Sequence, residues 1–273
     1  MKSKATKFIL WASGIGLIVY LVGWIGFYML QDKLIFQHKK LDKEYSFRFD
    51  QPFEEHFIQT EDGETLNALL FRTQKPSRGL VLYFHGNADN LQRWGEYAVD
   101  FTQLDYDILL MDYRGYGKST GAPTEIDFYK DAVTISVWAK VNIPYASLII
   151  YGRSLGAAVA SNLATVSNPD LLILETPFDD LKGSMYVPLG PLLNIFPLQY
   201  EFSTKTFLSK VICKKVIIHG TKDRVVPLSS ALRLKPLLGV GDQFVIIEGG
   251  GHRNLREFES YHTTLANALR GDN

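Results

Sequence analysis

One short segment has the residue types of a nucleophilic turn. Gly152-Arg153-Ser154-Leu155-Gly156 has the pattern G-x-S-x-G, which alone is a weak signal in a chain of this glycine and serine content. The flanking segments make the pattern more specific, because the apolar run LIIY (148–151) precedes it and LGAAVASNLATV (155–166) follows it. That order predicts a strand, a sharp turn and a helix, with Ser154 in a strained backbone conformation facing a cleft. The alternative is a serine that only caps the helix.

A base and an acid are predicted from two further loops. A serine hydroxyl is a poor nucleophile unless a base takes its proton, and the base must be oriented by an acid. His252 follows two glycines after the apolar run 244–248, and Asp223 follows the apolar run 216–220. The sequence therefore predicts a triad of Ser154, Asp223 and His252, in the chain order of α/β-type serine hydrolases. The alternatives are an exposed loop histidine and, at Asp223, an Asx turn before Val-Val-Pro.

A fourth segment, His85-Gly86-Asn87-Ala88, follows the apolar run 80–84. Negative charge that develops on a carbonyl oxygen requires preorganised N–H donors. We predict that the backbone N–H groups of Leu155 and Asn87 supply them. His85 is interpreted as a residue that braces this loop, His219 as a strand-end packing residue, and DYRGYGKS (112–119) as a rigid loop near the site.

The elements that must position these loops are visible as an alternating pattern. Short apolar runs at 80–84, 108–112, 148–152, 171–175, 216–220 and 244–248 alternate with helical stretches near 89–103, 124–140, 155–166, 228–237 and 254–270. Such runs suit strands buried on both faces of a parallel sheet. With a hairpin between 57–60 and 65–73, the pattern predicts an α/β fold with a mostly parallel, doubly wound sheet of about eight strands. Its carboxyl edge is where the four loops would meet.

Residues 177–210 interrupt this alternation. Four prolines in this segment exclude one long helix. We predict a short cap over the carboxyl edge of the sheet. Its apolar side chains would favour an apolar acyl group; they are Phe178, Leu181, Met185, Leu192, Leu193, Ile195, Phe196 and Leu198.

Composition narrows the class of protein. The 273 residues are 46% hydrophobic and 21% charged, with 29 basic and 29 acidic side chains, which excludes a disordered chain and removes the charge signature of a nucleic-acid binder. The single cysteine, Cys213, excludes an internal disulfide framework and a cysteine-built metal site. We expect no metal and no cofactor.

An apolar segment stands at the beginning of the chain. Residues 8–30 carry no charge, and a helix of that length spans about 34 Å, enough for a bilayer core of about 30 Å. Trp11 lies near one end, and Trp24 and Tyr28 near the other, where aromatic rings favour the headgroups. We predict a retained transmembrane helix within an anchor of residues 1–30. A cleavable signal peptide and a buried helix of a soluble protein are the alternatives.

The lysines around this segment give a weak signal for its orientation. Lys2, Lys4 and Lys7 precede it, and four lysines follow between residues 33 and 43. With the terminal amine, this pattern favours a cytoplasmic N-terminus and an external catalytic domain. We predict a juxtamembrane connector over 31–54 and a catalytic domain over 55–273.

The motifs HGNA, DYRGYGKS, YGRSLGAAVA, HGTKDRVVP and GGGH, in this order between about 55 and 271, resemble the α/β-hydrolase superfamily. The sequence is most similar to its serine aminopeptidase-like (S33-like) or acyl hydrolase-like branch, whose members often carry an N-terminal membrane anchor. The resemblance implies Ser154 as nucleophile, Asp223 as acid, His252 as base, and Asn87 and Leu155 as oxyanion donors, without cofactor or metal.

These observations together predict a membrane-anchored serine hydrolase. Its substrate would be a small-molecule or lipid-like acyl ester or thioester, and its other partner the membrane. One alternative is an aminopeptidase or amidase that uses the same triad. Prolyl aminopeptidases typically have a larger cap with an acidic residue for the substrate amine, and here only Glu175, Asp179 and Asp180 lie nearby. Another alternative is a catalytically idle, membrane-tethered binding module.

Overall fold

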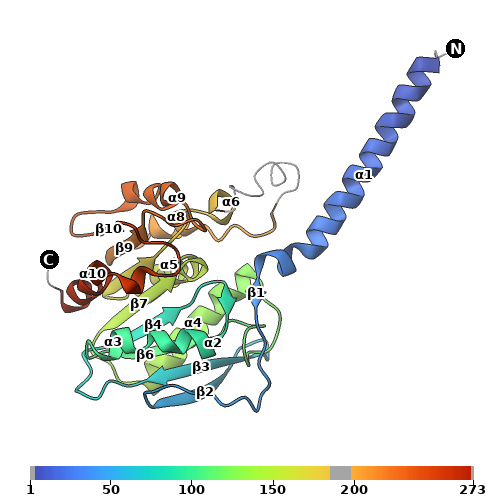
Figure 1. Cartoon of the computed structure of the whole chain (residues 1–273). Coiled ribbons are helices and arrows are strands. Elements are labelled where there is room, and N and C mark those ends of the chain that lie inside the picture. Colours follow the sequence, from blue (N-terminus) through green and yellow to red (C-terminus); the bar gives the residue numbers. More distant parts are fainter. Residues whose placement is uncertain (1–3, 185–197, 272–273) are drawn as a thin grey trace.

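An eight-stranded sheet forms the centre of the protein in this computed structural model, which describes residues 4–184 and 198–271 (Figure 1). The strand order is β10-β9-β8-β7-β4-β6-β3-β2. The strands are β2 (Phe53–Gln59), β3 (Thr65–Phe71), β4 (Leu80–Phe84), β6 (Asp107–Met111), β7 (Leu148–Arg153), β8 (Leu171–Glu175), β9 (Lys214–Gly220) and β10 (Gln243–Ile247). All six predicted apolar strands are therefore present within two residues at each end, and the predicted hairpin is present with a first strand that begins four residues earlier than expected.

The pairing directions confirm a mostly parallel sheet. β4, β6, β7, β8, β9 and β10 pair in parallel, whereas β3 pairs antiparallel with both β2 and β6. Parallel strands need a crossover between them, and the helices that supply these crossovers cover the sheet. The carboxyl ends of β4, β7, β9 and β10 consequently lie along one edge of the sheet.

The sheet is buried on both faces, as its continuous apolar strands require. In β7 the side chain of Ile150 lies in one core, and those of Ile149 and Tyr151 lie in the other. The first core lies under α4 (Glu125–Asn142), α5 (Leu155–Ser167) and α8 (Thr204–Leu208). The second lies under α2 (Leu91–Trp94), η1 (Gly95–Tyr97), α3 (Val99–Thr102) and α10 (Glu259–Arg270). The doubly wound arrangement is confirmed.

Three predicted helices are interrupted. The stretch 89–103 is divided into α2, η1 and α3, although Gly95, where α2 meets η1, keeps helical backbone angles of φ −61° and ψ −24°. A Cβ on Gly95 would lie 2.3 Å from the ring of Phe49, so glycine is needed there for close packing. The stretch 228–237 is divided into α9 (Leu228–Leu232) and η2 (Lys235–Leu237), because Pro236 lacks the N–H that would continue α9. Extended backbone at Phe258 separates η3 (Leu255–Glu257) from α10.

The N-terminal apolar segment is a helix, α1 (Lys4–Ile35), that projects away from the domain (Figure 1). Within its stretch Thr6–Lys33, an 18-residue segment has a mean hydropathy of 2.1. Among the described residues, α1 is the one helix long and apolar enough to cross a membrane. The helix continues past the predicted end at residue 30. Gln31, Ile35 and Phe36 are buried, so the first part of the predicted connector belongs to the folded domain.

The rest of the connector lies along the domain. The two-residue strand β1 (Gln37–His38) pairs in parallel with β5 (Ala88–Asp89), which begins at the last residue of the segment HGNA. Leu41 donates a backbone hydrogen bond to the carbonyl of Gly117, at 2.8 Å. The connector is therefore fastened to two of the loops that follow the sheet.

The predicted cap is described only in part. It contains α6 (Leu181–Ser184) and α8, and Met185, Leu192, Leu193, Ile195 and Phe196 lie outside the described residues. Phe178 and Leu181 are 3% and 6% exposed and belong to the core beside α5, and Leu198 packs against that core. These three side chains therefore pack in or against the core and do not line an open cleft.

Candidate active site

Ser154 lies in the turn between β7 and α5. Its backbone has φ 53° and ψ −116°, a strained conformation for a residue with a side chain. The backbone N–H donates to the carbonyl of Glu175 at 2.9 Å, whereas the side chain makes no capping hydrogen bond to the helix. The alternative interpretation, a serine that only caps α5, is therefore wrong.

The two glycines around Ser154 are required by close backbone approach. A Cβ on Gly152 would lie 2.4 Å from the carbonyl oxygen of Gly156, and a Cβ on Gly156 would lie 2.0 Å from the carbonyl oxygen of Phe84. Both distances are shorter than any tolerable contact. The glycines thus allow the start of α5 to pack directly against the end of β4, which brings the segment HGNA next to Ser154.

His252 and Asp223 complete a chain of hydrogen bonds to Ser154. The Nε2 atom of His252 lies 3.1 Å from the Oγ of Ser154, and its Nδ1 atom lies 2.7 Å from the Oδ2 of Asp223. The carboxylate is buried, while the imidazole is half-buried. The three residues that the sequence singled out, each on a different loop, therefore lie within hydrogen-bond distance in the predicted order.

Asp223 also forms the turn that was the alternative interpretation of its role. Its Oδ1 accepts hydrogen bonds from the N–H groups of Val225 and Val226, each at 2.8 Å, which leaves Oδ2 for His252. Burial opposes ionisation of this carboxyl, but the hydrogen bond and charge of His252 and the two N–H donors outweigh burial and lower its pKa. Asp223 is therefore ionised at neutral pH and held in one orientation.

The predicted oxyanion donors lie beside the nucleophile. A Cβ on Gly86 would lie 3.6 Å from the Cβ of Ser154, so the loop that carries Asn87 contacts the turn. Leu155 begins α5, where backbone N–H groups have no partner within the helix. Within residues 4–184 and 198–271, the N–H groups of Asn87 and Leu155 donate no hydrogen bond. Both are available to an external oxygen atom.

Aromatic donors that the sequence did not reveal fix this loop. The hydroxyl of Tyr116 donates to both the carbonyl oxygen and the Oδ1 of Asn87, at 2.9 Å each, and that of Tyr113 donates to the carbonyl of His85 at 2.9 Å. Trp94 Nε1 donates to the carbonyl of Ala88 at 2.7 Å. His85 itself is fully buried. In the sequence, the signal for these contacts was the pair of tyrosines in DYRGYGKS.

Arg153 is a second residue whose role the sequence did not reveal. It is 2% exposed, its Nη2 donates to the carbonyl oxygen of His252 at 2.8 Å, and its Nε lies 3.3 Å from the Oε1 of Glu175. Its guanidinium also lies over the rings of Trp94 and Tyr97, 5.2 and 4.9 Å from their centroids. The residue before Ser154 thus holds the loop that carries His252.

The acidic residues near the site all have partners. Glu175 pairs with Arg153 and accepts from the hydroxyl of Tyr151 at 2.6 Å. Asp179 binds Arg233 and accepts from the hydroxyl of Ser230 at 2.6 Å, and Asp180 binds Lys205 at 2.6 Å. These contacts fit a structural role. Among the described residues, no group of three or more His, Cys, Asp and Glu side chains could hold a metal ion.

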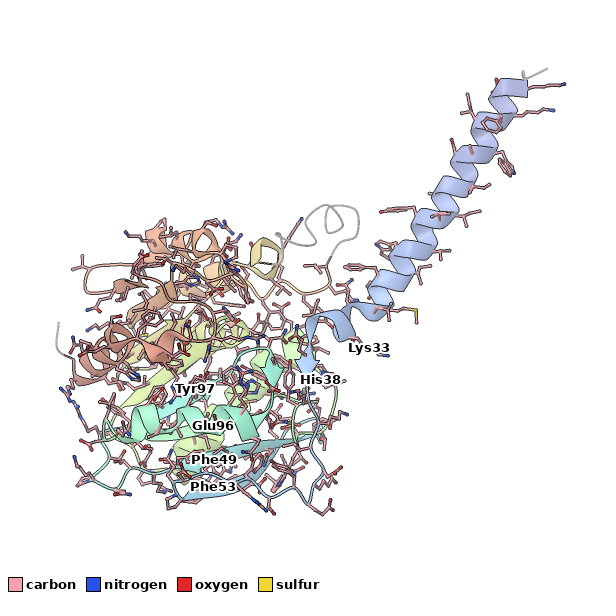
Figure 2. The ribbon with its side chains drawn as sticks, viewed as in Figure 1. Lys33, His38, Phe49, Phe53, Glu96 and Tyr97 are labelled. Atoms are coloured by element: carbon pink, nitrogen blue, oxygen red, sulfur yellow. The ribbon has the colours of Figure 1, made fainter. Side chains whose placement is uncertain are left out.

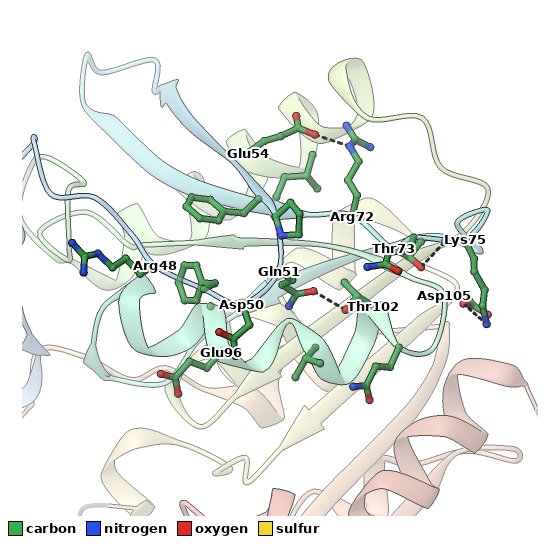
Figure 3. A pocket seen from close by; sticks show the side chains of 18 residues that line it. Arg48, Asp50, Gln51, Glu54, Arg72, Thr73, Lys75, Glu96, Thr102 and Asp105 are labelled. Atoms are coloured by element: carbon green, nitrogen blue, oxygen red, sulfur yellow. Dashed lines mark hydrogen bonds and ion pairs between the residues drawn. The ribbon is translucent and has the colours of Figure 1, made fainter.

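A separate groove of about 960 Å³ lies away from the triad (Figure 3). It is lined by residues of 48–54, 70–75 and 95–105, and four of its charged side chains form two ion pairs, Arg72 with Glu54 and Lys75 with Asp105. Ser154, Asp223 and His252 do not line it. The hydroxyl groups in its lining belong to Thr73 and Thr102, and no histidine lines the groove.

Comparisons with known proteins identify relatives of this chain. A family model described as serine aminopeptidase, S33, matches residues 75–197. An uncharacterized protein of Mycobacterium tuberculosis is 32% identical over 202 residues, which cover 72% of this chain and 71% of that protein. The human alpha/beta hydrolase domain-containing protein 17B is 27% identical over 226 residues, covering 82% of this chain and 77% of the human protein.

Solved structures give the same fold. The esterase Pf2001 of Pyrococcus furiosus superposes with a TM-score of 0.68, over 86% of this chain and 98% of the esterase, at 18% identity. A hydrolase from Agrobacterium vitis superposes with a TM-score of 0.61, over 81% and 99% of the two chains, at 20% identity. At identities of 18% and 20%, these superpositions show a shared fold and nothing further.

Proposed function

We propose that this chain, which belongs to the α/β-hydrolase superfamily, cleaves carboxylic ester or thioester bonds through Ser154, His252 and Asp223. The observation that carries the proposal is the pair of hydrogen bonds from Ser154 Oγ to His252 and from His252 to Asp223, at 3.1 and 2.7 Å. A hydroxyl, a base and an orienting carboxylate at these distances have the geometry of nucleophilic acyl transfer.

The reaction begins when Ser154 Oγ attacks the substrate carbonyl carbon and His252 Nε2 takes the hydroxyl proton. The carbonyl oxygen gains a negative charge, which the N–H groups of Asn87 and Leu155 stabilise. Collapse of the tetrahedral intermediate breaks the bond to the alcohol or thiol, which receives the proton from His252. Water then attacks the acyl-serine, His252 acts as base again, and the free acid leaves.

α1 is proposed to be a retained, single-pass membrane anchor. Its exposed apolar stretch Thr6–Lys33 has the length and hydropathy of a membrane span. The buried side chains at its end favour retention over cleavage, because Gln31, Ile35 and Phe36 pack into the domain. The lysine distribution favours a cytoplasmic N-terminus with an external domain. Anchoring would hold the site near lipid-like acyl esters, the proposed substrates.

The S33 description of the matching family raises aminopeptidase activity as a second candidate. Such an enzyme needs an unpaired carboxylate for the substrate's amine. Glu175, Asp179 and Asp180 are bound to Arg153, Arg233 and Lys205. These ion pairs favour ester cleavage. The idle binding module is disfavoured, because no member of the triad is missing.

Covalent labelling tests the proposal. A fluorophosphonate probe should label the full-length protein in detergent and should not label Ser154→Ala. The matched control is Ser161→Ala, because Ser161 lies on α5, two turns after Ser154, and is fully buried, and among the described residues its hydroxyl has no hydrogen-bond partner. Undiminished labelling of a folded Ser154→Ala variant would refute the nucleophile. Faster cleavage of aminoacyl amides than of acyl esters would favour the peptidase.

A further inference from the structure

The end of α1 is joined to the domain by hydrogen bonds. The backbone N–H of Gln199 donates to the side-chain oxygen of Gln31, and the Gln199 side chain donates to the carbonyl of Tyr28, both at 2.8 Å. The hydroxyl of Tyr200 donates to the carboxylate of Asp32 at 2.5 Å. Three contacts thus tie the last two turns of the helix to residues 199 and 200. In Figure 2 the base of α1, between the labelled Lys33 and His38, lies next to the domain.

Apolar contacts also hold the same end of α1 in the domain. Ile35 and Phe36 are 4% and 2% exposed and belong to the core beside α4 and α5. The Phe36 ring lies 5.5 Å from that of Phe128 and 5.1 Å from that of Tyr200, measured between centroids. The carbonyl of Ile35 is therefore held at a fixed place in the domain.

That carbonyl accepts a hydrogen bond from the side-chain amide of Asn87. The other side of the Asn87 amide, its Oδ1, accepts from Tyr116 at 2.9 Å. We propose that the end of α1 positions the oxyanion loop through this hydrogen bond, so that Ile35 and the Asn87 side chain are positioning residues of the active site. The inference rests on the proposed function, in which the backbone N–H of Asn87 stabilises the oxyanion.

The consequence for catalysis is specific. An oxyanion donor acts on charge that exists only in the transition state, so a donor that moves lowers kcat and leaves KM nearly unchanged. A trifluoromethyl ketone, which forms a tetrahedral adduct with the serine, should lose affinity in parallel. A merely structural role for Asn87 would lower thermal stability without this selective loss.

The chain offers a matched pair of variants. Asn90, three residues after Asn87, also donates its side-chain amide to a carbonyl of the connector, that of Lys39, at 3.1 Å. Its Oδ1 accepts from the N–H of Gln92 and starts α2, a role that aspartate also performs. Asn87→Asp and Asn90→Asp therefore remove the same kind of hydrogen bond from the same segment, and only the first touches a predicted oxyanion donor.

The experiment measures hydrolysis of a short soluble ester by the full-length protein in detergent. We expect Asn87→Asp to lower kcat at least tenfold, with KM within twofold and a similar loss of affinity for the trifluoromethyl ketone. Asn90→Asp should keep all three values within twofold. If Asn87→Asp does not fold, as judged by its melting temperature, Asn87→Ala replaces it, because alanine keeps the backbone N–H and adds no charge.

Two results separate the inference from the proposed function. Wild-type hydrolysis that Ser154→Ala does not reduce would overturn the proposed function and this inference with it. Wild-type hydrolysis that depends on Ser154, together with equal kcat values for the Asn87 and Asn90 variants, would overturn the inference alone. A loss that appears only in KM would also overturn it, because substrate binding and not the oxyanion would then depend on the contact.

Discussion

At Asp223, one carboxylate performs two tasks with its two oxygen atoms. Oδ1 closes a turn onto Val225 and Val226, and Oδ2 is left for His252. The sequence offered these roles as alternatives, and the structure combines them. The turn therefore supplies the rigidity that an orienting acid needs, because the carboxylate cannot rotate away from the imidazole without losing two hydrogen bonds.

Replacement of this acid gives the first prediction. Asp223→Asn keeps an oxygen that accepts from Val225 and Val226, but its amide favours the wrong tautomer of His252. We expect the variant to fold and kcat to fall by about 10⁴, as in the comparable protease case. Steady-state ester hydrolysis measures this. Asp179→Asn is the control, because that carboxylate binds Arg233 outside the triad. A loss below tenfold for Asp223→Asn, with a severe loss for Asp179→Asn, would transfer the acid to Asp179.

A second prediction concerns Arg153. Arg153→Lys keeps a positive charge opposite Glu175, but a single ammonium group cannot reproduce the guanidinium that spans Glu175 and the carbonyl of His252. We expect kcat to fall about tenfold to a hundredfold because the base is misplaced. The control is Arg114→Lys. Arg114 is also buried and pairs with Asp131 at 2.6 Å, away from the triad, so its loss should lower the melting temperature and not kcat. Equal kcat values for the two variants would contradict the prediction.

At the scale of elements, the parallel strands were predictable and several helices were not. β4, β8 and their neighbours are continuous apolar runs because both faces are buried, and such runs are visible in any sequence. The close approach of Gly95 to the ring of Phe49, which lies 46 positions earlier, exists only after folding. The same reason hid the contacts of Tyr116 with Asn87, whereas Ser154, Asp223 and His252 could be found because each follows a strand.

The helix α1 provides a third prediction. Deletion of residues 1–30 removes most of the apolar stretch but keeps Gln31, Ile35 and Phe36, which hold the end of the helix in the domain. We expect this variant to hydrolyse short soluble esters at the wild-type rate and esters embedded in vesicles more slowly. Both substrates are measured with both proteins in one vesicle preparation.

Deletion of residues 1–36 is the informative comparison. It also removes the carbonyl of Ile35, so hydrolysis of the short ester should fall as well. Equal vesicle rates for the wild type and the 1–30 deletion would mean that the anchor only localises the protein. A strong preference for acetyl over octanoyl esters would refute the expectation of an apolar acyl group.

At the scale of the whole molecule, the buried His219 couples stability to pH. Burial lowers the pKa of this imidazole below 6.5, although the charge of Asp223 and the carbonyl of Val226 act in the opposite direction. Below about pH 6.5 the unfolded chain binds a proton at this position, whereas the folded protein binds one only at lower pH. The difference in bound protons makes the free energy of unfolding decrease as the pH falls through this window.

Thermal unfolding in detergent checks this fourth prediction. The wild type should melt at a lower temperature at pH 5.5 than at pH 7.5. In His219→Gln, whose amide can still donate to the carbonyl of Val226, this difference should be smaller, whatever the variant's absolute stability. His262→Gln is the control, because His262 is exposed on α10. The same pH dependence in His219→Gln and the wild type would exclude His219 as the cause.

The contacts between the end of α1 and residues 199 and 200 have a consequence for the order of events during synthesis. Gln31 is translated early, but its partner Gln199 follows 168 residues later, which at about 5–20 residues per second is roughly ten to thirty seconds of translation. During that interval Tyr200 and Phe202, whose rings pack against that of Phe36, have not yet been synthesised. The helix α1 is therefore complete before the residues of the domain that bind its end have been made. The last contacts of this interface form when the late segment 198–202 docks onto residues 28–36, which are translated well before it.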